Sequence, residues 1–176
     1  MKHFFFLLLS CTLIGIILYS ILFIRPYRVS GDSMTPTLQD NAIILIDTLR
    51  ARIGTIRRGD ITVYLQENTP KVKRIIWTGN EILTIKEWWI YLDETRIVEP
   101  YLNQNIRTCV PGSCIDLSPK VFPVPENAYF ILGDNRENSR DSRGCLDAVS
   151  CDEKAIYYVQ KSDIIGKYIV ALPSLK

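Results

Sequence analysis

Few side chains in this sequence could act as a general base, and this restricts the chemistry open to it. The only histidine, His3, precedes a long apolar run, so a Ser-His-Asp triad is excluded within this chain. Lysine is the remaining candidate type, because a desolvated lysine can lose its proton near neutral pH. A serine nucleophile here would therefore need a lysine partner.

Lys73 is the lysine whose surroundings best suit that role. It lies in Val72 to Trp77, an apolar run that predicts a strand. Strand alternation would place Lys73, Ile75 and Trp77 on one face and Arg74 on the other. Burial beside large apolar groups, with no adjacent carboxylate, would lower the pKa of Lys73. The competing interpretation is an edge-strand lysine whose amine reaches water.

Ser33 is the candidate nucleophile, although an isolated serine beside Gly31 and Asp32 is typical of an ordinary turn. Pro36 restricts the backbone that follows and could hold Ser33 in a rigid, exposed turn. Met34 fits either a gap-filling core position or a contact with substrate.

A polar segment, residues 133–143, follows the strand-like Tyr129 to Leu132. It holds two Asp, three Arg, two Asn and two Ser in eleven positions. Gly-Asp-Asn is turn chemistry, so a solvated loop is the plainer interpretation. Polar groups on a loop that leaves a core strand also often build sites.

The five cysteines of the sequence indicate the cellular compartment of its soluble part. Cys11 lies in the apolar run, and the other four form two close pairs, which are Cys109 with Cys114 and Cys145 with Cys151. Short separations favour these pairings as disulfides, although four cysteines allow three connectivities and a four-thiolate zinc site is an alternative. Paired disulfides imply an oxidising compartment, so we expect the soluble part outside the cytoplasm.

The N-terminal segment must position this chemistry relative to a membrane. Residues 4–24 contain no charge and no proline, and as a helix they would span about 31 Å, close to the hydrocarbon thickness of a bilayer. A cleaved signal peptide would have a shorter apolar region followed by a small-x-small site, which is missing here. Leu8 to Cys11 resembles a lipobox, but cleavage there would leave Thr12 to Ile24 to be buried. We therefore expect an uncleaved transmembrane anchor in 4–24.

Strand signals dominate residues 25–176. They fall at 42–46, 61–65, 72–77, 82–85, 88–92, 128–132 and 164–170, and turn residues separate several of them. No long helical period follows the anchor. The pattern predicts a mainly β, antiparallel or barrel-like domain, with residues 144–156 as a polar excursion.

Composition excludes several other classes. The 176 residues carry 21 Lys and Arg against 19 Asp and Glu, so a net charge of +2 gives no case for a nucleic-acid partner. Gly-rich phosphate loops and H-E-x-x-H motifs are missing. We expect no metal and no cofactor, and the sequence leaves the oligomeric state open.

Four stretches resemble, in order, the type I signal peptidase family. They are Gly31 to Leu38, Arg58 to Tyr64, Val72 to Ile76 and Gly133 to Arg143. Weaker matches lie at Glu99 to Leu102, Val124 to Glu126 and Ile164 to Lys167. The ordered set covers about Ser30 to Lys167 in addition to the anchor, and it is far more specific than any one stretch.

The resemblance implies a serine-lysine endopeptidase that removes signal peptides from exported preproteins after small residues. Ser33 would be the nucleophile and Lys73 the general base. Ser139 would orient the lysine through a hydrogen bond. The resemblance also implies two supporting ion pairs, Asp141 with Arg143 and Asp134 with Arg74.

Two departures from the family pattern stand out. Gly31 occupies the position where some members carry a hydroxyl that donates to the oxyanion, so only the backbone N–H of Ser33 is identified as a donor. The segment from Cys145 to Cys151 lies where other members often continue directly toward the last strand.

Three alternatives remain at this point. The first is a relative dedicated to one secreted or conjugative pilus subunit, and the second is a catalytically silent, membrane-anchored binding domain. The third, a self-cleaving repressor, would need a DNA-binding domain, but the 32 residues before Ser33 hold only the anchor.

Overall fold

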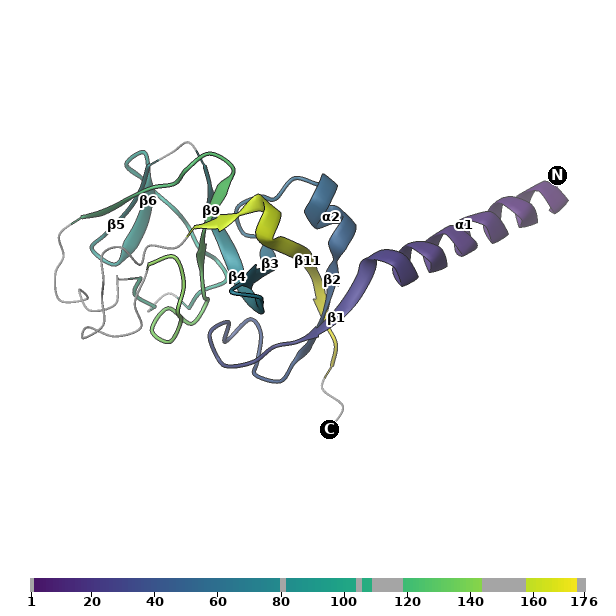
Figure 1. Ribbon diagram of the computed structural model, residues 1–176, viewed down its shortest axis with the longest axis horizontal. Helices are drawn as coiled ribbons and strands as arrows, with labels where there is room; N and C mark the ends of the chain where they lie inside the picture. The colour runs from purple at the N-terminus through teal and green to yellow at the C-terminus, as the bar shows by residue number, and fades with distance from the viewer. Residues whose placement is uncertain (1, 80–81, 104–105, 109–118, 144–157, 174–176) are drawn as a thin grey trace.

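The computed structural model describes residues 2–79, 82–103, 106–108, 119–143 and 158–173. Helix α1 (Lys2–Phe23) extends away from a body of β strands, and the strands farthest from it belong to a separate small sheet (Figure 1). Its segment His3–Phe23 is 21 residues long with a mean hydropathy of 2.5, and the side chains from His3 to Leu22 are exposed. That length and composition are sufficient to cross a bilayer.

The end of α1 is attached firmly to the β body. The chain passes directly into β1 (Ile24–Arg28), which pairs with β2 (Ile43–Asp47). The Thr48 hydroxyl donates to the Phe23 carbonyl at 3.0 Å, and the Tyr19 hydroxyl donates to the Asp47 carboxylate at 2.5 Å. Asp47 also caps the short helix α2 (Thr48–Ile53) by accepting from the Arg50 N–H.

Seven strands form the larger sheet, in the order β1-β2-β11-β3-β4-β9-β10, and every neighbouring pair is antiparallel. The five not yet given are β3 (Ile61–Gln66), β4 (Thr69–Thr78), β9 (Ala128–Leu132), β10 (Val159–Gln160) and β11 (Ile164–Ala171). A 3-10 turn, η2 (Lys161–Asp163), joins the last two. The expected mainly β, antiparallel fold with one N-terminal helix is confirmed.

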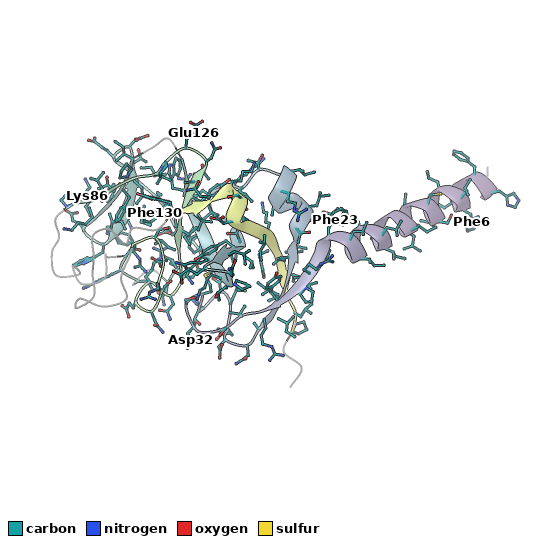
Figure 2. All side chains as sticks on the ribbon, in the orientation of Figure 1. Phe6, Phe23, Asp32, Lys86, Glu126 and Phe130 are labelled. Carbon is teal, nitrogen blue, oxygen red and sulfur yellow. The ribbon has the colours of Figure 1, made fainter. Side chains whose placement is uncertain are left out.

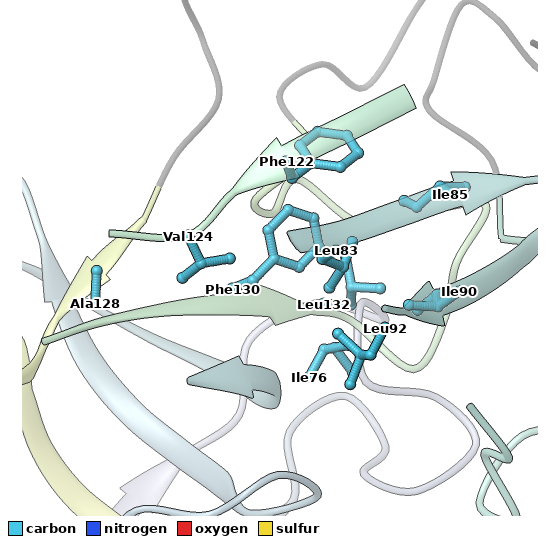
Figure 3. Close-up of a cluster of buried hydrophobic side chains, with 10 residues drawn as sticks. All are labelled: Ile76, Leu83, Ile85, Ile90, Leu92, Phe122, Val124, Ala128, Phe130 and Leu132. Carbon is cyan, nitrogen blue, oxygen red and sulfur yellow. The ribbon is translucent and has the colours of Figure 1, made fainter. Parts of the chain in front are cut away.

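Four strands form the smaller sheet, in the order β7-β6-β5-β8. They are β5 (Ile82–Lys86), β6 (Trp89–Leu92), β7 (Thr95–Arg96) and β8 (Lys120–Pro123). A buried apolar cluster joins this sheet to β4 and β9, and Figure 3 shows its side chains meeting between the strands. Phe122 and Phe130 pack at its centre with ring centroids 4.9 Å apart.

The strands expected from alternating or apolar runs are all present, with ends shifted by up to three residues among the described ones. Sequence reasoning missed β1, α2, β7, β8, η2 and β10. These elements are short, and β1 and β8 contain proline, so their sequences carry too little periodicity to predict them. The expected polar excursion at 144–156 lies outside the described residues.

One expectation about strand faces was wrong. A β-bulge interrupts β4, because Ile75 pairs with Ile131 while Trp77 pairs with Phe130. The extra residue shifts the side-chain alternation. Trp77 therefore packs with Ile76 against the cluster of the smaller sheet, whereas Ile75 is buried in a different cluster. Trp77 does not share the face of Lys73.

Candidate active site

Ser33 lies in the connection between β1 and β2, in a turn closed by the Thr35 N–H donating to the Asp32 carbonyl at 3.0 Å. The preceding Asp32 lies at the surface of the β body (Figure 2). Two hydrogen bonds tie the turn to the segment 133–143. The Asn135 N–H donates to the Ser33 carbonyl at 3.0 Å, and the Asn135 amide donates to the Asp32 carbonyl at 3.1 Å. The turn of Ser33 is therefore held in place by Asn135, which lies about a hundred positions farther along the chain.

Lys73 projects from β4 toward this turn. Its Nζ donates to Ser33 Oγ at 2.8 Å and to the Val72 carbonyl at 3.1 Å. The residue is 5% exposed. Desolvation is the main cause that lowers the pKa of Lys73 to about 8, and the nearby cations of Lys71 and Arg143 act in the same direction. An amine with this pKa can accept a proton from the hydroxyl it contacts.

The expectation that no carboxylate lies near Lys73 was wrong. Asp141 and Asp134 are close enough to raise the pKa of Lys73, although desolvation outweighs them. Both acids are paired with arginines, which limits their effect. Arg143 Nε donates to Asp141 Oδ1 at 2.8 Å, and Arg74 donates to Asp134 through both Nε and a terminal nitrogen at 2.8 and 2.6 Å.

Asp141 is a fully buried carboxylate whose partners are all within the site. Burial alone would raise its pKa, but Arg143, the Gly133 N–H and the Ser139 side chain together hold the pKa of Asp141 below its usual value. The Gly133 N–H donates to Asp141 Oδ2 at 3.0 Å. Asp141 therefore stays charged and orients the start of the segment that carries the site.

Ser139 is buried and lies at the centre of the site, but it does not make the hydrogen bond to Lys73 that the resemblance implies. Its Oγ has no hydrogen-bond partner of acceptable geometry among the described residues, although it is near enough to Asp141 to affect that group. A side chain at Gly133 would meet both Ser139 Oγ and the Ser33 carbonyl at about 2.2 and 2.3 Å. Only glycine fits between these two serines.

Met34 and Gly31 flank the nucleophile in different ways. Met34 is completely buried in a cluster with Leu38 and Ile44, which leaves no surface of its side chain for the expected contact with substrate. Gly31 has a φ of +84°, a conformation that disfavours other residues. Its N–H donates to the Asp40 carboxylate at 2.7 Å and is not free to bind an oxyanion.

Sequence reasoning assigned no role to Glu99, Tyr101 or Arg136, although a weak family match covered the first two. The Arg136 guanidinium is buried and donates to both Glu99 oxygens, to the Thr108 hydroxyl and to the Gly133 carbonyl. Tyr101 donates to Glu99 at 2.5 Å, and its ring lies 3.7 Å from the guanidinium of Arg74. These contacts attach the chain that follows β7 to the loop that carries Ser139.

The candidate disulfide residues Cys109, Cys114, Cys145 and Cys151 lie outside the described residues. Their pairing therefore stays a prediction. Cys11 is a free thiol on the exposed surface of α1.

We predict that Glu99→Leu destabilises the protein by about 3–5 kcal/mol, because it leaves the Arg136 charge buried without a counter-ion. Urea unfolding of the detergent-solubilised protein would measure this. The double variant Glu99→Leu/Arg136→Met should be more stable than the single one, because both charges are then removed. Glu126→Gln, at an exposed position, should stay within about 0.5 kcal/mol of wild type. A Glu99→Leu variant as stable as that control would contradict the network.

Comparison with known proteins gives a consistent result. A family model described as signal peptidase, peptidase S26, matches residues 1–172. Signal peptidase I S of Bacillus subtilis is 37% identical over 123 residues, which cover 69% of this chain and 67% of that protein. Signal peptidase I of Bacillus amyloliquefaciens is 34% identical over 142 residues, covering 79% of this chain and 75% of that protein.

One solved structure, a signal peptidase I from Enterococcus faecalis, matches with a TM-score of 0.45 and 20% identity over 68% of this chain and 97% of that one. The family match spans the anchor, the turn of Ser33, the strand of Lys73 and the 133–143 segment. The chain belongs to the signal peptidase I family of serine peptidases, peptidase S26.

Proposed function

We propose that this protein is a membrane-anchored endopeptidase that cleaves signal peptides from exported preproteins after small residues, with Ser33 as nucleophile and Lys73 as general base. The observation that carries the proposal is the 2.8 Å contact between Lys73 Nζ and Ser33 Oγ in a nearly dry environment. A serine hydroxyl is a weak nucleophile until an adjacent base removes its proton, and this contact provides such a base.

The reaction would proceed in two halves. Neutral Lys73 takes the Ser33 proton as Oγ attacks the scissile carbonyl carbon, and the resulting ammonium returns that proton to the leaving amine. Water then attacks the acyl-enzyme, again with Lys73 as base, and releases Ser33. The backbone N–H of Ser33 is the proposed oxyanion donor.

The supporting residues keep this pair in place and control its charge. Arg143 and Arg74 pair with Asp141 and Asp134, which limits how far these two acids raise the pKa of Lys73. The buried hydroxyl of Ser139 lies beside Gly133 and near Asp141, makes no hydrogen bond of good geometry with the described residues, and is assigned to orienting the lysine during turnover. Leaving such a group unpaired costs free energy, which favours an interaction made only during the reaction.

The anchor restricts where cleavage takes place. Ser33 follows Ile24 by nine residues, so an extended chain could carry it at most about 32 Å from the anchor. The nucleophile therefore acts close to the membrane surface, which suits a substrate whose own apolar segment is still in the bilayer.

We expect residues 26–176 on the non-cytoplasmic face, because the cysteine pairs favour an oxidising compartment. Protease added outside intact spheroplasts should digest this domain. A domain that stays protected until the membrane is permeabilised would reverse the assigned topology.

Incubation with a preprotein that carries an Ala-x-Ala site tests the activity itself. Detergent-solubilised wild type should release the mature chain, and Ser33→Ala should not. Replacing the alanine before the cut by phenylalanine should lower kcat/KM by roughly 10–200-fold, because a pocket that fits a methyl group is overpacked by a ring. Equal cleavage of both substrates would exclude specificity for small residues.

Lys73→Arg should lower kcat by at least ~10²-fold, because a guanidinium keeps its proton at any pH the enzyme tolerates. Lys71→Arg is the matched control, since Lys71 lies on the same strand two residues away and is exposed. It should retain activity. If the Lys71→Arg control lost activity while its unfolding curve stayed unchanged, the assignment of Lys73 as the base would be wrong.

The pH dependence should report the lowered pKa of Lys73. With a pKa of about 8, roughly one amine in ten is neutral at pH 7, so kcat/KM should rise about tenfold per pH unit below that value and level off above it. Lys71→Gln removes a cation that disfavours the ammonium, so it should move the midpoint upward. Lys86→Gln should leave the midpoint in place, and a midpoint near the ordinary lysine value in wild type would rule out the desolvated base.

A further inference from the structure

A groove of about 1100 Å³ lies where α1 joins the β body, on elements that the dyad does not use. The last residues of α1, Leu22 and Phe23, form part of its lining, and α2, β1 and η2 form much of the rest. Thr48 belongs to this lining and fixes its geometry by donating to the Phe23 carbonyl at 3.0 Å. The groove is therefore formed by the elements that hold the end of the helix.

The position of the groove places it at the depth of lipid headgroups. The apolar part of α1 is about as long as the hydrocarbon core is thick, so its last residues lie at the boundary of that core. In Figure 2, Phe23 marks this end of the helix, next to the β body. Whatever fills the groove must therefore suit the boundary between acyl chains and headgroups.

The lining has the two chemistries that a phospholipid presents. Leu22 and Phe23 are apolar, whereas Arg25, Arg52 and Lys161 bring three cations from three separate elements. Among the described residues that line the groove there is no aspartate or glutamate, and Arg52 and Lys161 are exposed and make no ion pair within the described part of the chain.

Arg25 has a second role at the same point. Its guanidinium donates to the carbonyls of Ile21 and Ile24, at 2.9 and 3.0 Å, and so caps the end of α1. Its position is thereby set at the edge of the groove, and one terminal nitrogen makes both of these bonds. A phosphodiester could accept from the rest of its fork and from Arg52 and Lys161 together.

We propose that this groove binds the headgroup of one anionic phospholipid, with its phosphate between Arg52 and Lys161 and an acyl chain along Leu22 and Phe23. Bound lipid would join α1, α2 and η2 on the membrane surface and limit how the β body can tilt over it. The inference depends on the membrane helix and not on Ser33 or Lys73, so its failure would leave the proposed peptidase reaction untouched.

The test is a titration of the full chain, held in zwitterionic detergent, with dihexanoyl phosphatidylglycerol below its critical micelle concentration. Calorimetry measures the binding. Wild type should bind one lipid, and dihexanoyl phosphatidylcholine should bind more weakly. The variant Arg52→Gln/Lys161→Gln should raise Kd about 20-fold or more, at about fivefold for each cation removed.

A second pair of substitutions separates a site from general attraction to negative charge. Arg28→Gln/Arg50→Gln removes the same charge from exposed positions on β1 and α2 that do not line the groove. This pair should change Kd by less than about twofold. Equal weakening by both pairs would overturn the proposal, as would failure to bind phosphatidylglycerol.

A titration with inorganic phosphate alone distinguishes a site for a lipid headgroup from a site for free phosphate. Phosphate should bind far more weakly than the lipid, because it cannot use the apolar side of the groove. Binding as tight as that of phosphatidylglycerol would mean a site for free anions and would overturn the assignment to lipid. Cleavage of the Ala-x-Ala preprotein by both double variants verifies that they remain folded.

Discussion

Water stabilises an ammonium group strongly, and its removal from around Lys73 is the physical change on which the rest of the site depends. The amine is nearly enclosed, and desolvation exceeds every other influence on its pKa. Two buried carboxylates nearby act against this effect. Their pairing with Arg143 and Arg74 limits how far the two carboxylates can raise the pKa of Lys73.

The loop 133–143 supplies most of these charged groups because it folds into the interior of the protein. Six of its side chains are buried, which are those of Asp134, Arg136, Ser139, Asp141, Ser142 and Arg143. Buried ion pairs add little net stability, because desolvation offsets most of their attraction. Here they fix geometry: Gly133 touches both serines, and its N–H and carbonyl bind Asp141 and Arg136. The chain that follows β7 contributes Glu99, which pairs with Arg136.

The anchor and the site are linked through the larger sheet. Strand β1 continues from α1 and leads directly into the turn of Ser33, while Thr48 and Tyr19 fix the end of the helix on α2 and β2. The groove beside this junction is lined by Arg25, Arg52 and Lys161. A body attached in this way would keep a limited range of orientations over the membrane, which suits the proposed nucleophile close to the surface.

Local patterns in the sequence predicted much of this molecule. An uncharged run of bilayer length predicts α1, and β-branched or apolar runs between turn residues predict β2, β3, β4, β5, β6, β9 and β11. The ordered stretches pointed to the family, and this is confirmed. The helix and the strands could be predicted because each depends on composition and spacing within one segment. The choice of lysine as base, which followed from the lack of a usable histidine, stays a proposal.

The tertiary structure decided what depends on contacts between distant segments. A bulge in β4 places Trp77 off the face of Lys73. The sequence of the strand by itself does not indicate where such an extra residue is accommodated. Met34 is buried in the core, and Ser139 lies against Gly133 and makes no hydrogen bond to the lysine. Glu99 gained its role only when folding buried Arg136 beside it. Burial and partner choice belong to the assembled chain, since a side chain's solvation is set by residues far away in the sequence.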